Sequence, residues 1–182
     1  MLRWVLVGVA VVLVVYVVAL YNGLITLRNR IEGAWAQIDV QLRRRYDLIP
    51  NLVKTVKGYA THERDTLEAV TEARAAAIDA GGPAEQARAD NMVTSALMSL
   101  FAVSEAYPDL KANQGFLQLQ EELSGTEGRI AYARQFYNDT VLRYNTKIQS
   151  FPSLVLAGPL QFRPREYFEV DGTARGPVQV DL

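Results

Sequence analysis

The sequence predicts an all-α protein with an N-terminal transmembrane helix, an antiparallel bundle of three to four long helices and an irregular C-terminal tail packed on that bundle. Three observations lead to this prediction. A long uncharged apolar run opens the chain, apolar side chains then recur at the spacing of one helix face, and Gly and Pro gather near the end. The expected division is an anchor over residues 1–27, a helical bundle over 28–151 and a Pro/Gly-rich tail over 152–182.

The anchor is expected because residues 4–27 form 24 consecutive positions without a charge. As a helix, this segment would extend about 36 Å, which exceeds the roughly 30 Å of a bilayer's hydrocarbon core. Signal peptides have shorter apolar runs followed by an A-x-A-like cleavage site, so we expect an uncleaved anchor that contacts the lipid bilayer through residues 4–27. Arg28 and Arg30 follow the run, whereas Arg3 precedes it. The positive-inside rule therefore predicts a cytoplasmic C-terminal domain.

The first helix of the bundle is predicted from the apolar stripe of residues 29–48, which recurs on one helix face. Pro50 interrupts this stripe and predicts a kink or a short break near Asp47, because a proline removes one helical hydrogen bond. The stripe then resumes through Val70. We therefore expect either one kinked helix or two helical segments with a short break between them.

The remaining helices are delimited by Gly and Pro. Gly81-Gly82-Pro83 ends the preceding helix, a further helix is expected over residues 84–106, and Pro108 suits the first turn of the next. The last long helix has apolar or small residues at alternating steps of three and four over about five heptads, which predicts packing at about 20° to a neighbour. Its seam is Phe116, Leu119, Leu123, Thr126, Ile130, Ala133, Tyr137, Thr140, Tyr144, Lys147 and Phe151.

The tail after Phe151 contains prolines and glycines that exclude a continuous helix, with Leu, Val, Phe and Tyr between them. Such a composition predicts a segment that packs on the bundle rather than a disordered linker. Arg163 and Arg165, beside Glu166 and Glu169, are expected to form its polar rim. The last ten residues are expected to fray.

Residue types needed for catalysis are scarce. The chain has no cysteine and one histidine, His62, which excludes a thiolate site and a multi-histidine metal site. A Gly-rich phosphate loop and a Gly-x-Ser-x-Gly motif are also absent from the sequence. We therefore expect a protein that is not an enzyme and has no catalytic residue, metal or cofactor. The net charge of −1 also argues against a nucleic-acid partner.

The run Arg43-Arg44-Arg45 is the strongest local charge. One interpretation is attraction to anionic lipid headgroups. Arg43 would lie about 24 Å beyond residue 27 along a helix, which is two to three Debye lengths, so we favour ion pairing inside the bundle. The expected acidic partners are Glu63, Glu68, Glu121 and Glu122.

Six segments carry a resemblance to a known family: Asn29–Val53, Val56–Glu63, Tyr107–Asn113, Ala131–Asn138, Phe151–Ser153 and Arg165–Glu169. Together they resemble the LemA family of bacterial membrane proteins over nearly the whole chain. The resemblance implies a single-pass protein of the bacterial cell (inner) membrane with a long-helix bundle and no established enzymatic activity or cofactor. Family members are often encoded near membrane proteases, which implies an association with envelope protein quality control. The resemblance also implies packing or kink roles for Asp47, Pro50, Asn51 and Asn145.

Two classes of function follow. The first is a non-enzymatic interaction or scaffold module that recruits or regulates a membrane protein partner. Its expected contact residues are Arg43, Arg44, Arg45, His62, Glu63, Tyr167 and Phe168. The alternative is a structural homo-oligomer or a membrane-shaping element, in which Ala19 and Gly23 would let two anchors approach closely.

Overall fold

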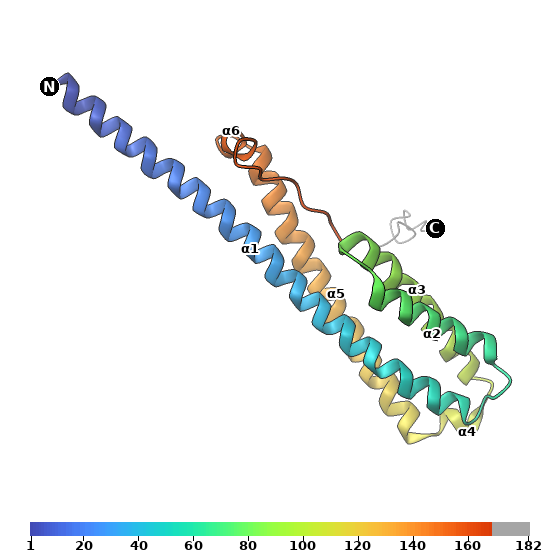
Figure 1. Cartoon of the computed structure of the whole chain (residues 1–182). Coiled ribbons are helices and arrows are strands. Elements are labelled where there is room, and N and C mark those ends of the chain that lie inside the picture. The colour runs from blue at the N-terminus through green and yellow to red at the C-terminus, as the bar shows by residue number, and fades with distance from the viewer. Residues whose placement is uncertain (169–182) are drawn as a thin grey trace, which may run out of the picture. The chain divides into compact units, whose positions relative to one another are not determined.

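The structure, a computed structural model, describes residues 1–168 (Figure 1). Over this range the chain is helical and has no strand, which confirms the predicted all-α fold. The chain divides into two units. Unit 1 contains residues 1–36 and 135–166, and unit 2 contains residues 37–134 together with 167–168. The helices are α1 (Leu2–Lys57), α2 (Arg64–Asp79), α3 (Pro83–Ser104), α4 (Pro108–Lys111), α5 (Gln114–Gln149) and α6 (Ser153–Ala157).

The N-terminal part of α1 is apolar and exposed on every side. From Leu2 to Ala19 each residue is exposed, and none of the most apolar stretch is buried against the rest of the chain. Among the described residues, α1 is the helix that is long and apolar enough to cross a membrane. Apolar side chains on all faces are typical of a helix surrounded by lipid, which agrees with the predicted anchor.

Of the two outcomes predicted at Pro50, a kink or a short break, the break is wrong, because α1 continues through this residue to Lys57. A proline at position 50 has no N–H to donate to the carbonyl oxygen of Tyr46. In the structure the Nε of Arg74 donates to this oxygen at 2.8 Å. A side chain from α2 thus replaces the missing helical donor, and Pro50 itself is exposed, where its ring meets no core packing.

The interruption lies instead between α1 and α2, at residues 58–63. The sequence predicts helix across this region, since Val56, Tyr59 and Ala60 continue the apolar stripe. In the structure the N–H groups of Tyr59 and Ala60 both donate to the carbonyl oxygen of Val56, which closes a turn. Ala60 is fully buried there, so a turn, and not a helix, buries this apolar residue of the stripe.

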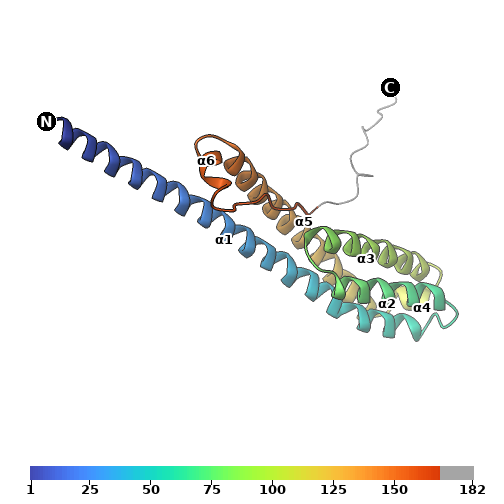
Figure 2. The ribbon, with the colours of Figure 1, turned by 45° about the horizontal axis from the view of Figure 1, so that its top comes forward.

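Unit 2 is a bundle of the last part of α1, α2, α3 and the first part of α5. Figures 1 and 2 show α2 and α3 side by side and antiparallel. They are joined at Gly82, whose φ of 86° is in a region that favours glycine. The main apolar core residues are Ile38, Leu42, Ile49, Leu52, Val56, Val70, Val93, Leu97, Leu100, Leu110, Phe116, Leu123 and Ile130.

Unit 1 pairs the N-terminal part of α1 with the second half of α5 (Figure 2). The rings of Trp35 and Tyr137 lie 5.7 Å apart between centroids, and those of Tyr21 and Phe162 lie 5.8 Å apart. The predicted seam of α5 is largely buried up to Tyr144. Phe151 is 83% exposed, however, because α5 ends at Gln149.

The tail is less irregular than predicted, since it includes the short helix α6. Ser153, Ala157 and Phe162 are buried, which agrees with a tail that packs on other helices. In the predicted polar rim, Arg165 pairs with Glu32 at 2.8 Å. Glu169 and the last ten residues, which are expected to fray, lie outside the described residues. The boundaries at residues 27 and 151 stay a prediction.

Candidate functional site

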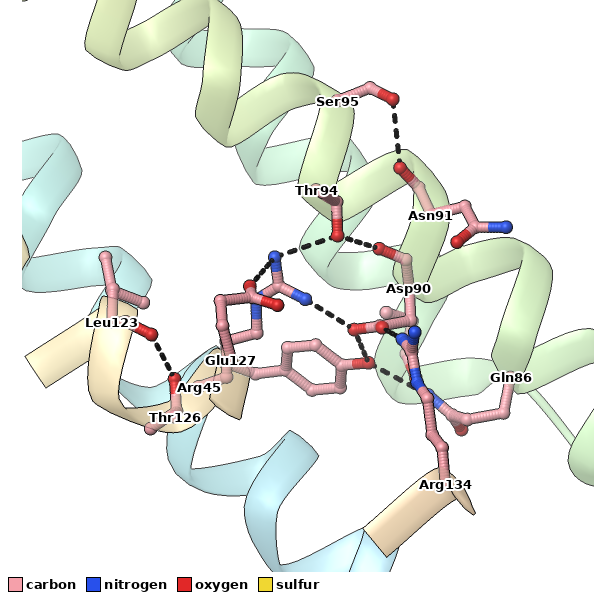
Figure 3. A network of polar contacts seen from close by, with 12 residues as sticks. Arg45, Gln86, Asp90, Asn91, Thr94, Ser95, Leu123, Thr126, Glu127 and Arg134 are labelled. Atoms are coloured by element: carbon pink, nitrogen blue, oxygen red, sulfur yellow. Dashed lines mark hydrogen bonds and ion pairs between the residues drawn. The ribbon is translucent and has the colours of Figure 1, made fainter. Parts of the chain in front are cut away.

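The main cluster of charged side chains in unit 2 surrounds Asp90, a carboxylate on α3 that is completely buried (Figure 3). One of its oxygens accepts a hydrogen bond from Nη1 of Arg45 at 2.8 Å, and the other accepts one from Nη2 of Arg134. Arg45 belongs to α1 and Arg134 to α5. A single carboxylate therefore joins three helices of the bundle.

Arg45 makes further contacts from the same guanidinium. Its Nη2 lies 2.5 Å from Glu127 on α5 and donates to the hydroxyl oxygen of Thr94 at 3.0 Å. Arg45 is 1% exposed, whereas nearly half of the Glu127 side chain is exposed. The two arginines and two carboxylates balance in charge, and only Glu127 has large exposure to solvent.

Tyr46 and Gln86 extend the network by neutral hydrogen bonds. The Tyr46 hydroxyl donates to Asp90 at 3.3 Å and accepts a bond from Nε2 of Gln86 at 3.0 Å. The same amide nitrogen also donates to the carbonyl oxygen of Ala77 on α2 at 3.0 Å. Each of the four main helices of unit 2 thus contributes at least one atom to this network.

Burial sets the electrostatics of the network. Burial lowers the pKa of Arg45, an effect that the nearby Glu127 opposes. Burial and the neighbouring Arg45 cation lower the pKa of Arg134 to about 10, so this side chain stays charged at neutral pH. The Nε atoms of both arginines have no hydrogen-bond partner among residues 1–168. The carboxylates of Asp90 and Glu127 are both paired with guanidinium groups. This arrangement suits a structural role, in which the ion pairs determine which helix faces pack together.

The three arginines of the predicted run have different environments. Arg43 is exposed and pairs with Asp39 at 2.9 Å, and Arg44 is exposed. Arg45 is buried, which agrees with the favoured pairing inside the bundle. The predicted acidic partners were wrong: Arg45 pairs with Asp90 and Glu127 and not with Glu63, Glu68, Glu121 or Glu122.

The other predicted contact residues do not form one exposed surface. His62 is exposed in the turn before α2, and Glu63 accepts a hydrogen bond from the Tyr107 hydroxyl at 3.2 Å.

Tyr167 is half-buried, whereas Phe168 is buried and its ring lies 4.7 Å from the Arg134 guanidinium. Phe168 and Arg45 are therefore packing residues in this structure. A partner contact by the others stays a prediction.

Sequence reasoning missed Asp90 and Gln86, although a signal for them exists. The buried positions of α3 include 86, 90, 93, 97, 100 and 104, which alternate steps of four and three. Asp90 and Gln86 therefore occupy seam positions of an otherwise apolar stripe, and Arg45 does the same on α1 between Leu42 and Ile49. A charge on a seam predicts a buried partner of opposite sign.

A second polar contact, in unit 1, holds the tail. The side chain of Asn145 donates to the carbonyl oxygen of Arg165 and accepts from its N–H, both at 2.9 Å. The Tyr137 hydroxyl donates to the carbonyl oxygen of Glu166 at 2.9 Å. These bonds satisfy the backbone of an irregular segment on α5, which gives Asn145 the packing role implied by the resemblance.

Replacing Asn145 by alanine is expected to loosen the tail. The backbone groups of Arg165 would lose both bonds, at a cost of about 1–3 kcal/mol. We expect faster amide hydrogen exchange over residues 158–166. Gln149→Ala, at an exposed position on the same helix, should leave this exchange unchanged. Equal exchange rates in the two variants would contradict the contact.

We expect the protein to lose stability at high pH because of the buried Tyr137 side chain. Burial raises the pKa of Tyr137 to about 12 from its ordinary value of 10. Between these values the unfolded chain gives up the phenolic proton and the folded chain keeps it, so the free energy of unfolding falls as pH rises from 10 to 12. Urea unfolding should show a steeper fall for the unmodified chain than for Tyr137→Phe. Parallel curves would contradict the assignment.

The sequence profile of the LemA family matches residues 34–182, which is most of the chain and includes the whole of α2, α3 and α5. The chain belongs to the LemA family. The network around Asp90 lies entirely within the matched residues, whereas most of the exposed apolar part of α1 precedes them.

Curated relatives match most of this LemA-family chain, and the match covers more than two thirds of each relative. Protein LemA of Metamycoplasma hominis is 29% identical over 88% of the chain and 73% of the relative. Magnetosome proteins MamQ 1 and MamQ 2 of Paramagnetospirillum magneticum are each 26% identical over 87% of the chain and 68% of the relative. Family and relatives together indicate a bacterial, membrane-associated helical protein.

Proposed function

We propose that this chain is a single-pass, non-enzymatic interaction module of the bacterial inner membrane. In this proposal, residues 4–27 of α1 anchor it and the C-terminal helices lie in the cytoplasm, where they recruit or regulate a membrane protein partner. The apolar, lipid-compatible start of α1 supports the anchor. Magnetosome proteins are among the relatives, which supports a role in the organisation of a bacterial cell rather than in one metabolic reaction. A role in envelope protein quality control is the process that we favour.

The observation that carries the proposal is the outward face of α3. Residues 91–104 contain no charged side chain, and their exposed positions include Met92 and Met98. The hydroxyls of Ser95 and Ser99 donate to carbonyl oxygens of their own helix, four residues earlier, so these donors are already satisfied. Methionine is frequent on protein-binding surfaces because its flexible side chain adapts to different partners. An exposed, uncharged helix face of this kind suits a protein partner.

Photo-crosslinking in native membranes tests the proposal. A photoreactive amino acid replaces Met98 in the full chain, and a second variant carries it at Ile78, an exposed apolar position on α2. We expect one defined heteromeric product from position 98 and little product from position 78. Equal product patterns at the two positions would contradict the α3 surface.

The same experiment distinguishes the structural alternative. A homo-oligomer that uses Ala19 and Gly23 in the anchor would give a product with twice the mass of the chain. Such a product, without a heteromeric one, would overturn the recruitment of a partner. Gly23 also lies against Lys147 of α5, since a Cβ placed on it would meet the Lys147 Nζ at 2.8 Å. The Lys147 side chain therefore already lies against this side of Gly23 within unit 1, which leaves less room there for a second anchor and favours the interaction module.

A further inference from the structure

The turn between α5 and α6, in unit 1, has an apolar surface that no other described residue covers. Residues 148–162 contain no charged side chain. Phe151 is 83% exposed, Val155 63% and Leu154 55%, and Leu160 is also exposed. We call these four residues the apolar tip. Ser153 and Ala157 are buried, so one side of α6 packs on protein and the opposite side is open.

The apolar tip lies beside the end of the membrane-spanning segment of α1. The Phe162 ring, just after the tip, contacts the Tyr21 ring at 5.8 Å between centroids. Lys147, just before it, reaches Gly23. Because the two helices run antiparallel with the same rise per residue, Phe151 lies at the level of about residue 20 of α1. Figure 2 shows this turn next to α1.

This level coincides with the end of the fully exposed part of α1. Residues 2–19 are exposed, and Leu20 is the first residue of the anchor that another part of unit 1 covers in part. Tyr21 follows directly, and tyrosine favours the headgroup region of a bilayer. The apolar tip is therefore next to the bilayer surface wherever the anchor spans the bilayer.

The charges around the apolar tip have one sign. Residues 20–31 and 140–164 contain no Asp or Glu. They contain five cations. Lys147 and Arg163 lie just before and just after the tip in the chain. The other three, Arg28, Arg30 and Arg143, lie further along the two helices, at about the level of Leu142 or beyond. An exposed apolar surface flanked by cations is typical of a segment that binds an anionic bilayer surface.

We propose that the apolar tip inserts into the headgroup–acyl boundary of the same bilayer that α1 spans, with Lys147 and Arg163 facing anionic headgroups. The protein then has two membrane contacts, the anchor and the turn between α5 and α6. The continuity of the tip with the anchor identifies lipid as the occupant. This inference rests on the membrane anchor of the proposed function, but not on the identity of a partner.

Fluorescence quenching by brominated lipids tests the insertion. The chain has no cysteine, so a single introduced cysteine can carry a bimane label at one defined position. The full chain is reconstituted into vesicles of phosphatidylcholine and phosphatidylglycerol, in which the phosphatidylcholine carries bromine near the headgroup or deep in the acyl chains. The labelled variants are Leu154→Cys in the tip, Leu142→Cys on α5 and Val12→Cys in the anchor.

Leu142 is a matched control, because it is 54% exposed and Leu154 is 55% exposed. By the same antiparallel register it lies about 12 Å further from the bilayer. We expect shallow bromines to quench the label at position 154 several-fold more than the label at 142, and deep bromines to quench the label at position 12.

Two results would overturn the inference, and they are distinguishable. Strong quenching at position 12 with equal, weak quenching at 154 and 142 would show that the anchor spans the bilayer and the tip stays outside it. Weak quenching at all three positions would show that α1 does not span the bilayer, which would overturn the proposed anchor as well.

Discussion

Asp90→Ala is expected to lower the free energy of unfolding of unit 2 by about 3–5 kcal/mol, because it leaves two buried guanidinium groups without their shared carboxylate. Arg45 and Arg134 both donate to Asp90, and Arg45 is almost completely buried. Glu127 would still pair with Arg45, but no described carboxylate contact would remain for Arg134. Urea unfolding of the full chain in detergent, followed by helical circular dichroism, measures this loss.

The control for this experiment is Asp39→Ala. Asp39 pairs with Arg43 one turn away on α1, and both side chains are well exposed to solvent. Such a surface pair contributes less than about 1 kcal/mol. If Asp90→Ala destabilised the chain no more than Asp39→Ala, the network would not hold the helices of unit 2 together.

Tyr137→Ala is expected to have a similarly large effect, confined to unit 1. Tyr137 is buried, packs its ring against Trp35 and donates to the backbone of Glu166. Truncation of a buried aromatic side chain to alanine costs about 3–5 kcal/mol. Hydrogen exchange should become faster over residues 24–36 and 158–166.

Tyr132→Ala is the matched control, since Tyr132 is on the same helix but 72% exposed. It should change exchange very little. Protection of α2 and α3, which belong to unit 2, should persist in both variants. If Tyr137→Ala accelerated exchange in α2 and α3 as much as in residues 158–166, the two units would unfold together and not independently.

The parts of the fold that could be predicted from the sequence are those set by local pattern. The anchor follows from an uncharged run, and the last long helix follows from a heptad repeat that is largely buried up to Tyr144. The ends of α3 agree with prediction to within two residues, because Pro83 and Pro108 constrain the backbone on either side. These signals depend only on neighbours in the chain.

The errors arise where a distant side chain decides the outcome. Pro50 does not break α1, since Arg74 of α2 supplies the donor that the proline removes. Nothing near position 50 in the sequence indicates this contact. The break at residues 58–63 was missed because the apolar stripe continues through Ala60, and periodicity alone does not separate a buried turn from a helix.

The sequence predicted buried ion pairs for the arginine run but did not identify the acidic residues that form them. Ion pairing of the arginine run inside the bundle is confirmed for Arg45, yet its partners are on α3 and α5. The choice among many acids depends on which helix faces meet, which the heptad seam of one helix does not specify. Asp90 and Gln86 occupy seam positions themselves, so a search for polar residues on apolar stripes would have found them.

The most direct measurement of the central claim, that α1 anchors the mature protein in a membrane, is the intact mass of the protein extracted from membranes washed at alkaline pH. We expect the protein to stay in the washed membranes with a mass that includes residues 4–27. Release into the wash, or a mass that lacks residues 1–27, would contradict the anchor and with it the membrane role proposed for the helices that follow.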